Sequence, residues 1–273
     1  MSASGSRSFD VIIIGGGPGG YVAAIRASQL GLTVVLVERE HLGGVCLNWG
    51  CIPTKALLHA ADLLREIRHG SDFGIVAAPK VDLAAMVQRS RDVAGQLNKG
   101  VGGLLRKHEV TVIDGSARLD GEGRVKVSTH DGEEILESDS IVIATGARAR
   151  DLPHIKADRK RIWTAREAMV PQSIPKRLLV IGAGAIGIEF ASFYATLGSK
   201  VTVVEVLPQV LPVEDDDISR LMGEALVNDG IEVHCGTAVT GLEPQGKVLR
   251  ATLEKDGEQT EAEFDYAILA VGV

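Results

Sequence analysis

The first strong apolar signal in the chain is an unbroken β-branched run, Val11–Ile14, which is typical of a buried strand in a parallel sheet. A glycine-rich turn follows, and then the helix-like stretch Tyr21–Leu30, which Gly31 is expected to end as a C-terminal cap. The next apolar run, Thr33–Val37, predicts a second strand that ends at Glu38. Together these elements predict a β-α-β unit.

The turn of this unit carries a G-x-G-x-x-G motif made by Gly15, Gly17 and Gly20. Glycines permit a tight turn and a close backbone approach, so that a pyrophosphate can sit on the N-terminus of the helix. Glu38, at the end of the second strand, can accept a hydrogen bond from a ribose hydroxyl. We therefore expect a dinucleotide site here.

The same pattern occurs a second time in the chain. A strand-like run, Arg177–Ile181, leads into a motif that contains Gly182, Gly184 and Gly187, and a later strand ends at Glu205. One such motif alone is weak evidence, because it can be only a tight packing turn. Two in register, each with its own strands and terminal acid, predict two dinucleotide sites.

The residues between the repeats predict mixed structure. Leu83–His108 reads as a helix interrupted at Gly95 and again near Gly100, and the alternation of apolar and polar residues in Glu109–Ile143 predicts short antiparallel strands. The proline-containing stretch Asp151–Lys176 is the expected domain connection. The predicted fold is therefore α/β: two Rossmann-like, three-layer nucleotide-binding domains, residues 1–150 and 151–273, with parallel sheets and an inserted antiparallel β segment.

Composition and net charge limit the kinds of partner that the chain is expected to bind. Of the 273 residues, 45% are hydrophobic, and the net charge is -7. The negative charge argues against a nucleic-acid partner, which would normally require a basic surface. No apolar run approaches the roughly 18 residues that a membrane span needs, and the N-terminus lacks the apolar core of a secretion signal. We expect a soluble protein of the cytoplasm or another reducing compartment. Three cysteines are too few for a structural disulfide framework.

Two of these cysteines, Cys46 and Cys51, lie in the glycine-flanked stretch 43–55. Pro53 favours a helix start close to Cys51, where the helix dipole stabilises a thiolate, and Lys55 adds a nearby positive charge. The alternatives are two buried cysteines that only pack, or a zinc site. The third cysteine, Cys235, lies in a separate strand-like run without a second cysteine pair, so no metal site is expected.

Together, these features resemble the flavoprotein disulfide reductases. The cysteine stretch Cys46–Lys55 is most similar to that of the dihydrolipoyl dehydrogenases, and the paired glycine motifs and the runs 144–146 and 270–272 agree with the family. The resemblance implies that the first motif holds FAD and the second NAD. It also implies FAD contacts at Gly44, Lys55, Gly115, Thr145 and Gly146, and NAD contacts at Val239 and Gly272.

The resemblance further implies different roles for the two cysteines. Cys46 would exchange with the dithiol substrate, dihydrolipoamide on an acyltransferase of a 2-oxoacid dehydrogenase complex, and Cys51 would pass the electron pair to FAD and so to NAD. Lys55 would lie on the flavin side, with Glu189 as its partner carboxylate. The residues themselves favour NAD over NADP, because Glu205 would repel a ribose phosphate and no Lys or Arg occurs from 201 to 219.

The family would continue beyond Val273, through the rest of the NAD domain and an interface domain that forms a homodimer and carries a His and Glu pair. None of the seven histidines lies in such a motif. We therefore expect an incomplete NAD domain, no interface domain and poor lipoamide turnover. The alternatives are another flavoprotein disulfide reductase, a mercuric reductase, or a nucleotide-binding module without catalysis.

Overall fold

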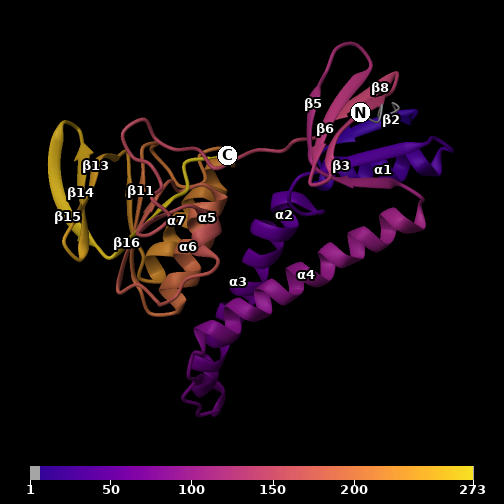
Figure 1. The fold of residues 1–273 in the computed structure, drawn as a ribbon. Helices are drawn as coiled ribbons and strands as arrows, with labels where there is room; N and C mark the ends of the chain where they lie inside the picture. The colour runs from indigo at the N-terminus through magenta and orange to yellow at the C-terminus, as the bar shows by residue number, and fades with distance from the viewer. Residues whose placement is uncertain (1–6, 273) are drawn as a thin grey trace. The chain divides into compact units, whose positions relative to one another are not determined.

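The computed structural model describes residues 7–272, whose contacts divide the chain into two compact units (Figure 1). The first unit contains residues 7–53 and 91–147, and the second contains 54–90 and 148–272. The division passes through the helices α3 (Cys51–His69) and α4 (Leu83–Lys107). Residues 54–90 thus pack with the second unit, and the boundary near residue 150 between an FAD and an NAD domain stays a prediction.

The first unit is built on a parallel sheet. Its strand order is β4 (Thr111–Asp114), β3 (Val34–Glu38), β2 (Val11–Ile14) and β8 (Ser140–Ile143). Helix α1 (Pro18–Gln29) connects β2 to β3, which completes the predicted β-α-β unit. Parallel strands of this kind are covered on both faces, which explains their continuous apolar sequences.

Alternate residues of these strands face two different layers. Ile12 and Val35 pack against an antiparallel sheet of β5 (Ser116–Leu119), β6 (Arg124–Thr129) and β7 (Gly132–Glu137), with β1 (Arg7–Ser8) beside β7. Ile13 and Leu36 pack on the other face, against residues of α1 and α4 and of the short helix α2 (Gly44–Trp49). The unit therefore has three layers.

The second unit repeats this plan. Its parallel sheet has the order β12 (Glu232–Cys235), β11 (Lys200–Glu205), β10 (Arg177–Ile181), β16 (Tyr266–Leu269) and β9 (Ile162–Trp163). One face packs against α3 and α6 (Ala185–Thr196). The other face packs against the antiparallel strands β13 (Ala238–Gln245), β14 (Val248–Lys255) and β15 (Glu258–Phe264).

Three further elements complete the described chain. Helix α5 (Ala165–Ala168) follows β9, and α7 (Asp216–Asn228) lies between β11 and β12. A 3-10 turn, η1 (Gly70–Phe73), ends α3. Within residues 7–272, no helix combines the length and the apolar character that crossing a membrane requires.

The predicted fold class is confirmed, but two local predictions were wrong. Helix α4 is continuous, because buried residues such as Val101 and Leu105 outweigh a cost of about 1 kcal/mol per helical glycine. Strands β4 and β8, which the alternation of residues 109–143 predicted as antiparallel, both join the parallel sheet. The predicted connection contains the short strand β9 of the second parallel sheet. An antiparallel sheet occurs in each unit.

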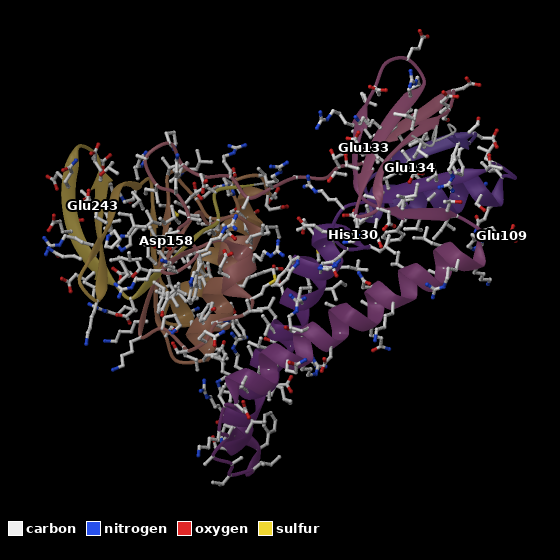
Figure 2. The ribbon with its side chains drawn as sticks, in the orientation of Figure 1. Glu109, His130, Glu133, Glu134, Asp158 and Glu243 are labelled. Carbon is white, nitrogen blue, oxygen red and sulfur yellow. The ribbon has the colours of Figure 1, made fainter. Side chains whose placement is uncertain are left out.

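Charged side chains cover the outer surfaces of the antiparallel strands. Adjacent residues of a strand point to opposite faces, and the neighbours Glu133 and Glu134 on β7 accordingly pair with different cations, Lys126 and Arg7 (Figure 2). His130 and Asp131, at the turn between β6 and β7, are fully exposed. These charged side chains are in contact with solvent.

Asp265 provides a test of the junction between β15 and β16. Its carboxylate accepts the backbone N–H groups of Lys176 and Arg177 and is paired with the Arg177 guanidinium at 3.1 Å. Partial burial raises the pKa of Asp265, but these Arg177 and Lys176 contacts outweigh it and hold the pKa below its ordinary value of 3.8.

Because the pKa is lowered in the folded state, this carboxylate stabilises the fold above its unfolded pKa, and the effect is lost as the pH falls through the folded pKa. We expect Asp265→Asn to lower the free energy of unfolding by about 1 kcal/mol at pH 7, with the difference shrinking below about pH 4. Denaturant melts at several pH values test this, with the exposed Asp131→Asn as control. A difference that stays constant down to pH 3 would contradict the assignment.

Candidate functional site

The glycine turn of the first unit is closed by direct backbone contact. Gly15 has a φ of +107°, and a Cβ placed there would lie 2.2 Å from the Ala144 carbonyl oxygen. A Cβ at Gly20 would lie 1.8 Å from the Gly15 carbonyl oxygen. No side chain fits in either place, so helix α1 starts directly against the end of β2.

The second glycine turn has the same geometry. Gly182 has a φ of +102°, and a Cβ there would lie 2.4 Å from the Ala270 carbonyl oxygen. A Cβ at Gly187 would meet the Gly182 carbonyl oxygen at 2.0 Å. The equivalence of the two motifs, expected from their register in the sequence, therefore extends to the contacts that close them.

Both turns leave the start of a helix open to an anion. Gly17 is the N-cap of α1 and Gly184 is the N-cap of α6, and neither start has a side-chain cap in the described chain. The first N–H groups of a helix have no partner inside the helix, and they attract negative charge. The geometry fits a pyrophosphate at each helix start.

The two predicted acids lie beside these turns in matching positions. Glu38 accepts hydrogen bonds from the backbone N–H groups of Gly16, at 2.6 Å, and Glu40, at 2.8 Å. Glu205 accepts them from Ala183, at 2.7 Å, and Leu207, at 2.9 Å. Each carboxylate therefore contacts the glycine turn of its own unit, where dinucleotide folds receive the ribose hydroxyls.

Three further predicted residues of the first unit are close to this turn. The Gly115 N–H donates to the Glu38 carbonyl oxygen, and a Cβ at Gly115 would lie 2.8 Å from the Ser128 carbonyl oxygen. The backbone of Thr145 lies against Gly15, and Gly146, with a φ of +70°, follows it. The structure thus gathers these residues at the carboxyl end of the parallel sheet.

The two predicted NAD contacts of the second unit, Gly272 and Val239, lie in different surroundings. Gly272 has a φ of +111° and its carbonyl oxygen accepts the Arg150 N–H, in the segment that follows the Gly182 contact at Ala270. The Val239 side chain is buried in the core between the sheets, and its carbonyl oxygen contacts His154 Nε2 at 2.9 Å. Only the backbone of Val239 is therefore suited to a polar nucleotide contact.

The cysteine segment is attached to the first glycine turn. Gly43, with a φ of +87°, donates its N–H to the Gly16 carbonyl oxygen at 2.8 Å. A Cβ at Gly44 would lie 2.7 Å from the Gly17 Cα, so helix α2 begins in contact with the first glycine turn. The predicted nucleotide site and the predicted redox segment therefore share one piece of backbone.

The two cysteines lie on successive helices of this segment. Cys46 is half-buried on α2, and Cys51 is exposed at the start of α3. Gly50 joins the helices, and a Cβ at Gly50 would lie 3.1 Å from the Cys46 Cα. A side chain at Gly50 would crowd the backbone of Cys46, so this glycine lets α3 follow α2 after a single residue.

Lys55 and Glu189 meet within the second unit. Lys55 lies one turn after Cys51 on α3, and its Nζ is 2.5 Å from Glu189 Oε1 on α6. The lysine side chain is largely exposed, so the pair adds little to stability by itself. The contact identifies Glu189 as an ion-pair partner of Lys55. The catalytic role of the pair stays a prediction.

Sequence reasoning missed a polar network around α2. Asn48, only 8% exposed, donates to the Leu42 and Gly44 carbonyl oxygens, both at 2.9 Å. Arg91 and Asn98 of α4 contact the same segment. The spacing of Arg91 and Asn98 could have revealed the network, because it places both residues on the face of α4 that buries Ala94, Val101 and Leu105.

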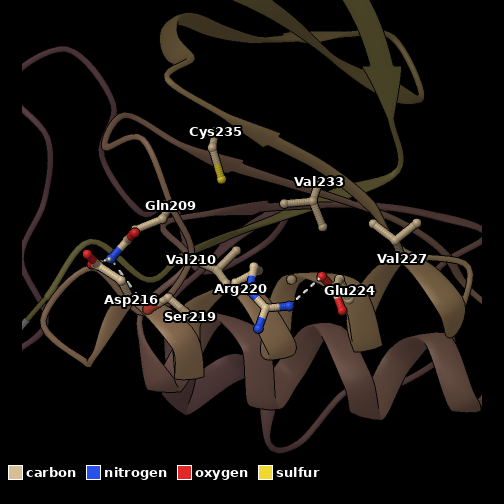
Figure 3. A pocket seen from close by; sticks show the side chains of 10 residues that line it. Gln209, Val210, Asp216, Ser219, Arg220, Glu224, Val227, Val233 and Cys235 are labelled. Atoms are coloured by element: carbon tan, nitrogen blue, oxygen red, sulfur yellow. Dashed lines mark hydrogen bonds and ion pairs between the residues drawn. The ribbon is translucent and has the colours of Figure 1, made fainter.

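The third cysteine lies apart from this arrangement, in an open cavity of about 320 Å³ between β12 and α7 (Figure 3). Burial raises the pKa of the Cys235 thiol, and the charge of Glu205 adds to this effect. The Arg220–Glu224 ion pair borders the cavity. Across residues 7–272, no three metal-binding side chains gather closely enough to hold an ion.

Comparison with known proteins supports the interpretation of these features. The sequence profile described as "Pyridine nucleotide-disulphide oxidoreductase" matches residues 9–273. Dihydrolipoyl dehydrogenase from Zymomonas mobilis is 51% identical over 97% of this chain and 58% of its own length, and that from Rhizobium etli is 48% identical over 98% and 60%. The chain thus spans about three fifths of the curated relatives it matches.

A solved structure shares the fold. LpdA from Mycobacterium tuberculosis superposes with a TM-score of 0.88 at 29% identity, over 96% of this chain and 58% of that one. The HOCl-induced flavoprotein disulfide reductase RclA from Escherichia coli, in its Cu(II) complex, gives 0.83 at 27% identity. The agreement with flavoprotein disulfide reductases therefore holds in three dimensions as well as in sequence.

Gly184, the N-cap of α6, and Gly187, in its first turn, give a matched test of the second turn. A Cβ at Gly184 meets no atom within 4 Å, whereas one at Gly187 collides with backbone. We expect Gly187→Ala to lower the free energy of unfolding by about 2–3 kcal/mol. Gly184→Ala should leave stability nearly unchanged and weaken NAD binding about tenfold or more, because its methyl group enters the space of the pyrophosphate.

Thermal melts and NAD titrations of the two variants distinguish these effects. Equal losses of stability in both variants would show that the close contact at Gly187 does not hold the turn together.

Proposed function

Because the chain belongs to the pyridine nucleotide-disulphide oxidoreductase family, we propose that it is the part of a dihydrolipoyl dehydrogenase that binds FAD and NAD and carries the redox-active cysteines. The protein would transfer electrons from dihydrolipoamide to NAD. The observation that carries this proposal is the attachment of the cysteine segment to the first glycine turn, through the Gly43 N–H and the Gly16 carbonyl oxygen at 2.8 Å.

The chain's own residues supply the thiol chemistry. Cys51 stands at the start of α3, where the helix dipole favours a thiolate. Cys46 would exchange with the substrate dithiol, and Cys51 would lie on the flavin side. When bound, FAD supplies an acceptor for the electron pair and a hydride donor to the nicotinamide.

Lys55 and Glu189 would tune the flavin side of this reaction. Lys55 lies one helical turn after Cys51, so its positive charge would stand on the same side of α3 as the reacting thiol. Glu189 accepts a hydrogen bond from Lys55 and so restricts the position of the ammonium group. The pair would thus keep a positive charge near the reacting thiolate without neutralising it.

The preference for NAD follows from charge at the second site. Glu205 is only 7% exposed, and its two carboxylate oxygens are fixed by backbone N–H groups. A phosphate on the ribose would be repelled, and residues 201–219 contain no Lys or Arg to neutralise it. Glu38 would receive the FAD ribose in the corresponding way.

The partner follows from the substrate. Dihydrolipoamide is presented on an acyltransferase of a 2-oxoacid dehydrogenase complex, and we propose that the protein serves such a complex as a homodimer. Residues 1–150 would form the FAD domain and residues 151–273 would belong to the NAD domain. The relatives named dihydrolipoyl dehydrogenase support the proposed substrate and partner complex.

The electron path is tested by spectroscopy. The FAD-loaded chain should develop a thiolate-to-flavin charge-transfer band when its disulfide is reduced, because Cys51 would lie against the flavin. Cys51→Ser should abolish the band, whereas Cys46→Ser and the control Cys235→Ser should retain it. A chain that binds no flavin would instead support a nucleotide-binding module without catalysis, and a band that survives in Cys51→Ser would reverse the roles of the cysteines.

The cofactor preference is tested at Glu205. Glu205→Gln keeps an acceptor oxygen for the Ala183 N–H but removes the charge, so the ratio of NAD affinity to NADP affinity should fall about tenfold, or about 1.4 kcal/mol. The exposed neighbour Glu214→Gln serves as the control and should leave the ratio unchanged. Binding titrations with both nucleotides measure the ratio, and no change in Glu205→Gln would mean that the discrimination lies elsewhere.

A further inference from the structure

Helix α2 carries Cys46 but is too short to be stable alone. It has only six residues, Gly44–Trp49, and isolated helices shorter than about 12–15 residues are marginal in water. Its Leu47 is buried in the core of the first unit. Gly43 attaches the start of the helix to the first glycine turn, and the remaining contacts that hold the helix are polar ones.

The N-terminal end of α2 is held by two amides. The Leu42 carbonyl oxygen accepts from Asn48 Nδ2 at 2.9 Å and from Asn98 Nδ2 at 2.6 Å. Asn98 Nδ2 also lies 3.3 Å from Asn48 Oδ1. Asn48 and Asn98 therefore form one network that connects the residue before α2, the body of α2 and the long helix α4.

The C-terminal end of α2 is held by Arg91 of α4. Its Nη2 donates to the Asn48 carbonyl oxygen at 2.5 Å, and its guanidinium carbon lies 4.3 Å from the centre of the Trp49 ring. The last carbonyl groups of a helix have no partners inside the helix. A cation there also complements the helix dipole, so Arg91 fixes the point where the chain turns from α2 toward Cys51.

Arg91 and Asn98 belong to the inward face of α4. Together with Ala94, Val101 and Leu105 they recur at intervals of three and four residues, which places them on one side of the helix. The three apolar residues are buried, whereas the two polar ones occur where α4 meets the cysteine segment. Polar residues at inward positions that all contact one segment indicate that the segment needs a defined conformation.

From this arrangement we propose that Arg91 and Asn98 are positioning residues, which hold the segment between Cys46 and Cys51 in one conformation and thereby set the stability of their disulfide. The inference rests on the proposed function, because it requires these cysteines to interconvert between dithiol and disulfide. It goes further in assigning a role to α4, which carries no cysteine and no glycine motif.

The physical basis is the effective concentration of the two thiols. An intramolecular disulfide is favoured in proportion to how well the fold holds the two sulfur-bearing residues near each other. Cys46 and Cys51 lie on successive helices that only Gly50 separates. Without Arg91, the Asn48 carbonyl and the Trp49 ring lose this anchor, the dithiol form gains conformational freedom, and closing the disulfide costs more entropy.

The test is a redox titration of the purified chain with its cofactors. The protein is equilibrated in glutathione and glutathione disulfide at graded ratios, quenched with acid and alkylated, and the peptides of Cys46 and Cys51 are quantified by mass spectrometry. Each protein disulfide that is reduced takes two electrons and two protons from two glutathione thiols and yields one glutathione disulfide. The readout does not depend on turnover.

We expect Arg91→Met to lower the equilibrium constant for disulfide formation about fivefold to tenfold, which corresponds to about 20–30 mV. Arg91→Lys, which keeps the charge but not the planar fork, should give an intermediate value, and Asn98→Ala should lower it about threefold. Lys99→Met removes a positive charge from the exposed side of α4 and is the matched control, expected to match the wild type. Melting curves in both redox states verify that each variant is folded.

The outcomes separate the two proposals. If folded Arg91→Met titrates like Lys99→Met, the positioning role is overturned while the proposed function stands. If the wild type forms no disulfide between Cys46 and Cys51 at any ratio, both proposals fall. If Arg91→Met does not fold, Arg91→Lys and Asn98→Ala decide, and wild-type equilibrium constants in both of these would overturn the positioning role.

Discussion

Backbone-to-backbone contact at the two glycine turns is the constraint on which the rest of the structure depends. At Gly20 and Gly187, a single added carbon would lie within 2.0 Å of a carbonyl oxygen of the same turn. Only this close approach lets a helix start directly from the end of a buried strand, with its N–H groups open. The positions of Glu38 and Glu205 follow, because each carboxylate is hydrogen-bonded to the turn itself.

The same glycine turn also constrains the position of the cysteine segment. Because the Gly43 N–H donates a hydrogen bond to the Gly16 carbonyl oxygen, the first glycine turn also positions the segment that carries the thiol pair. The segment is too short to hold itself, and it obtains its definition from Asn48, Arg91 and Asn98. Rigid glycine contacts on one side and polar anchors on the other thus serve one purpose, which is to give two thiols a fixed environment.

Duplication explains much of the architecture. Each unit has a parallel sheet between a helical layer and an antiparallel sheet, and alternate strand residues such as Ile12 and Ile13 face the two layers. The units differ in what has been added to this plan. The first carries the cysteines, and the second carries Glu189, which meets Lys55 on a helix that begins in the first unit and packs with the second.

Sequence by itself determined the features that depend on local chemistry: the two glycine motifs, their strands and acids, and the paired cysteines. These are readable because only glycine permits the close contacts and only cysteine forms the disulfide. Tertiary structure alone decided that α4 runs unbroken through its glycines, that β4 joins the parallel sheet, and that Arg91 and Asn98 reach α2. Those outcomes depend on burial and on contacts between residues more than 40 positions apart, such as Arg91 and Asn48, which local propensity cannot encode.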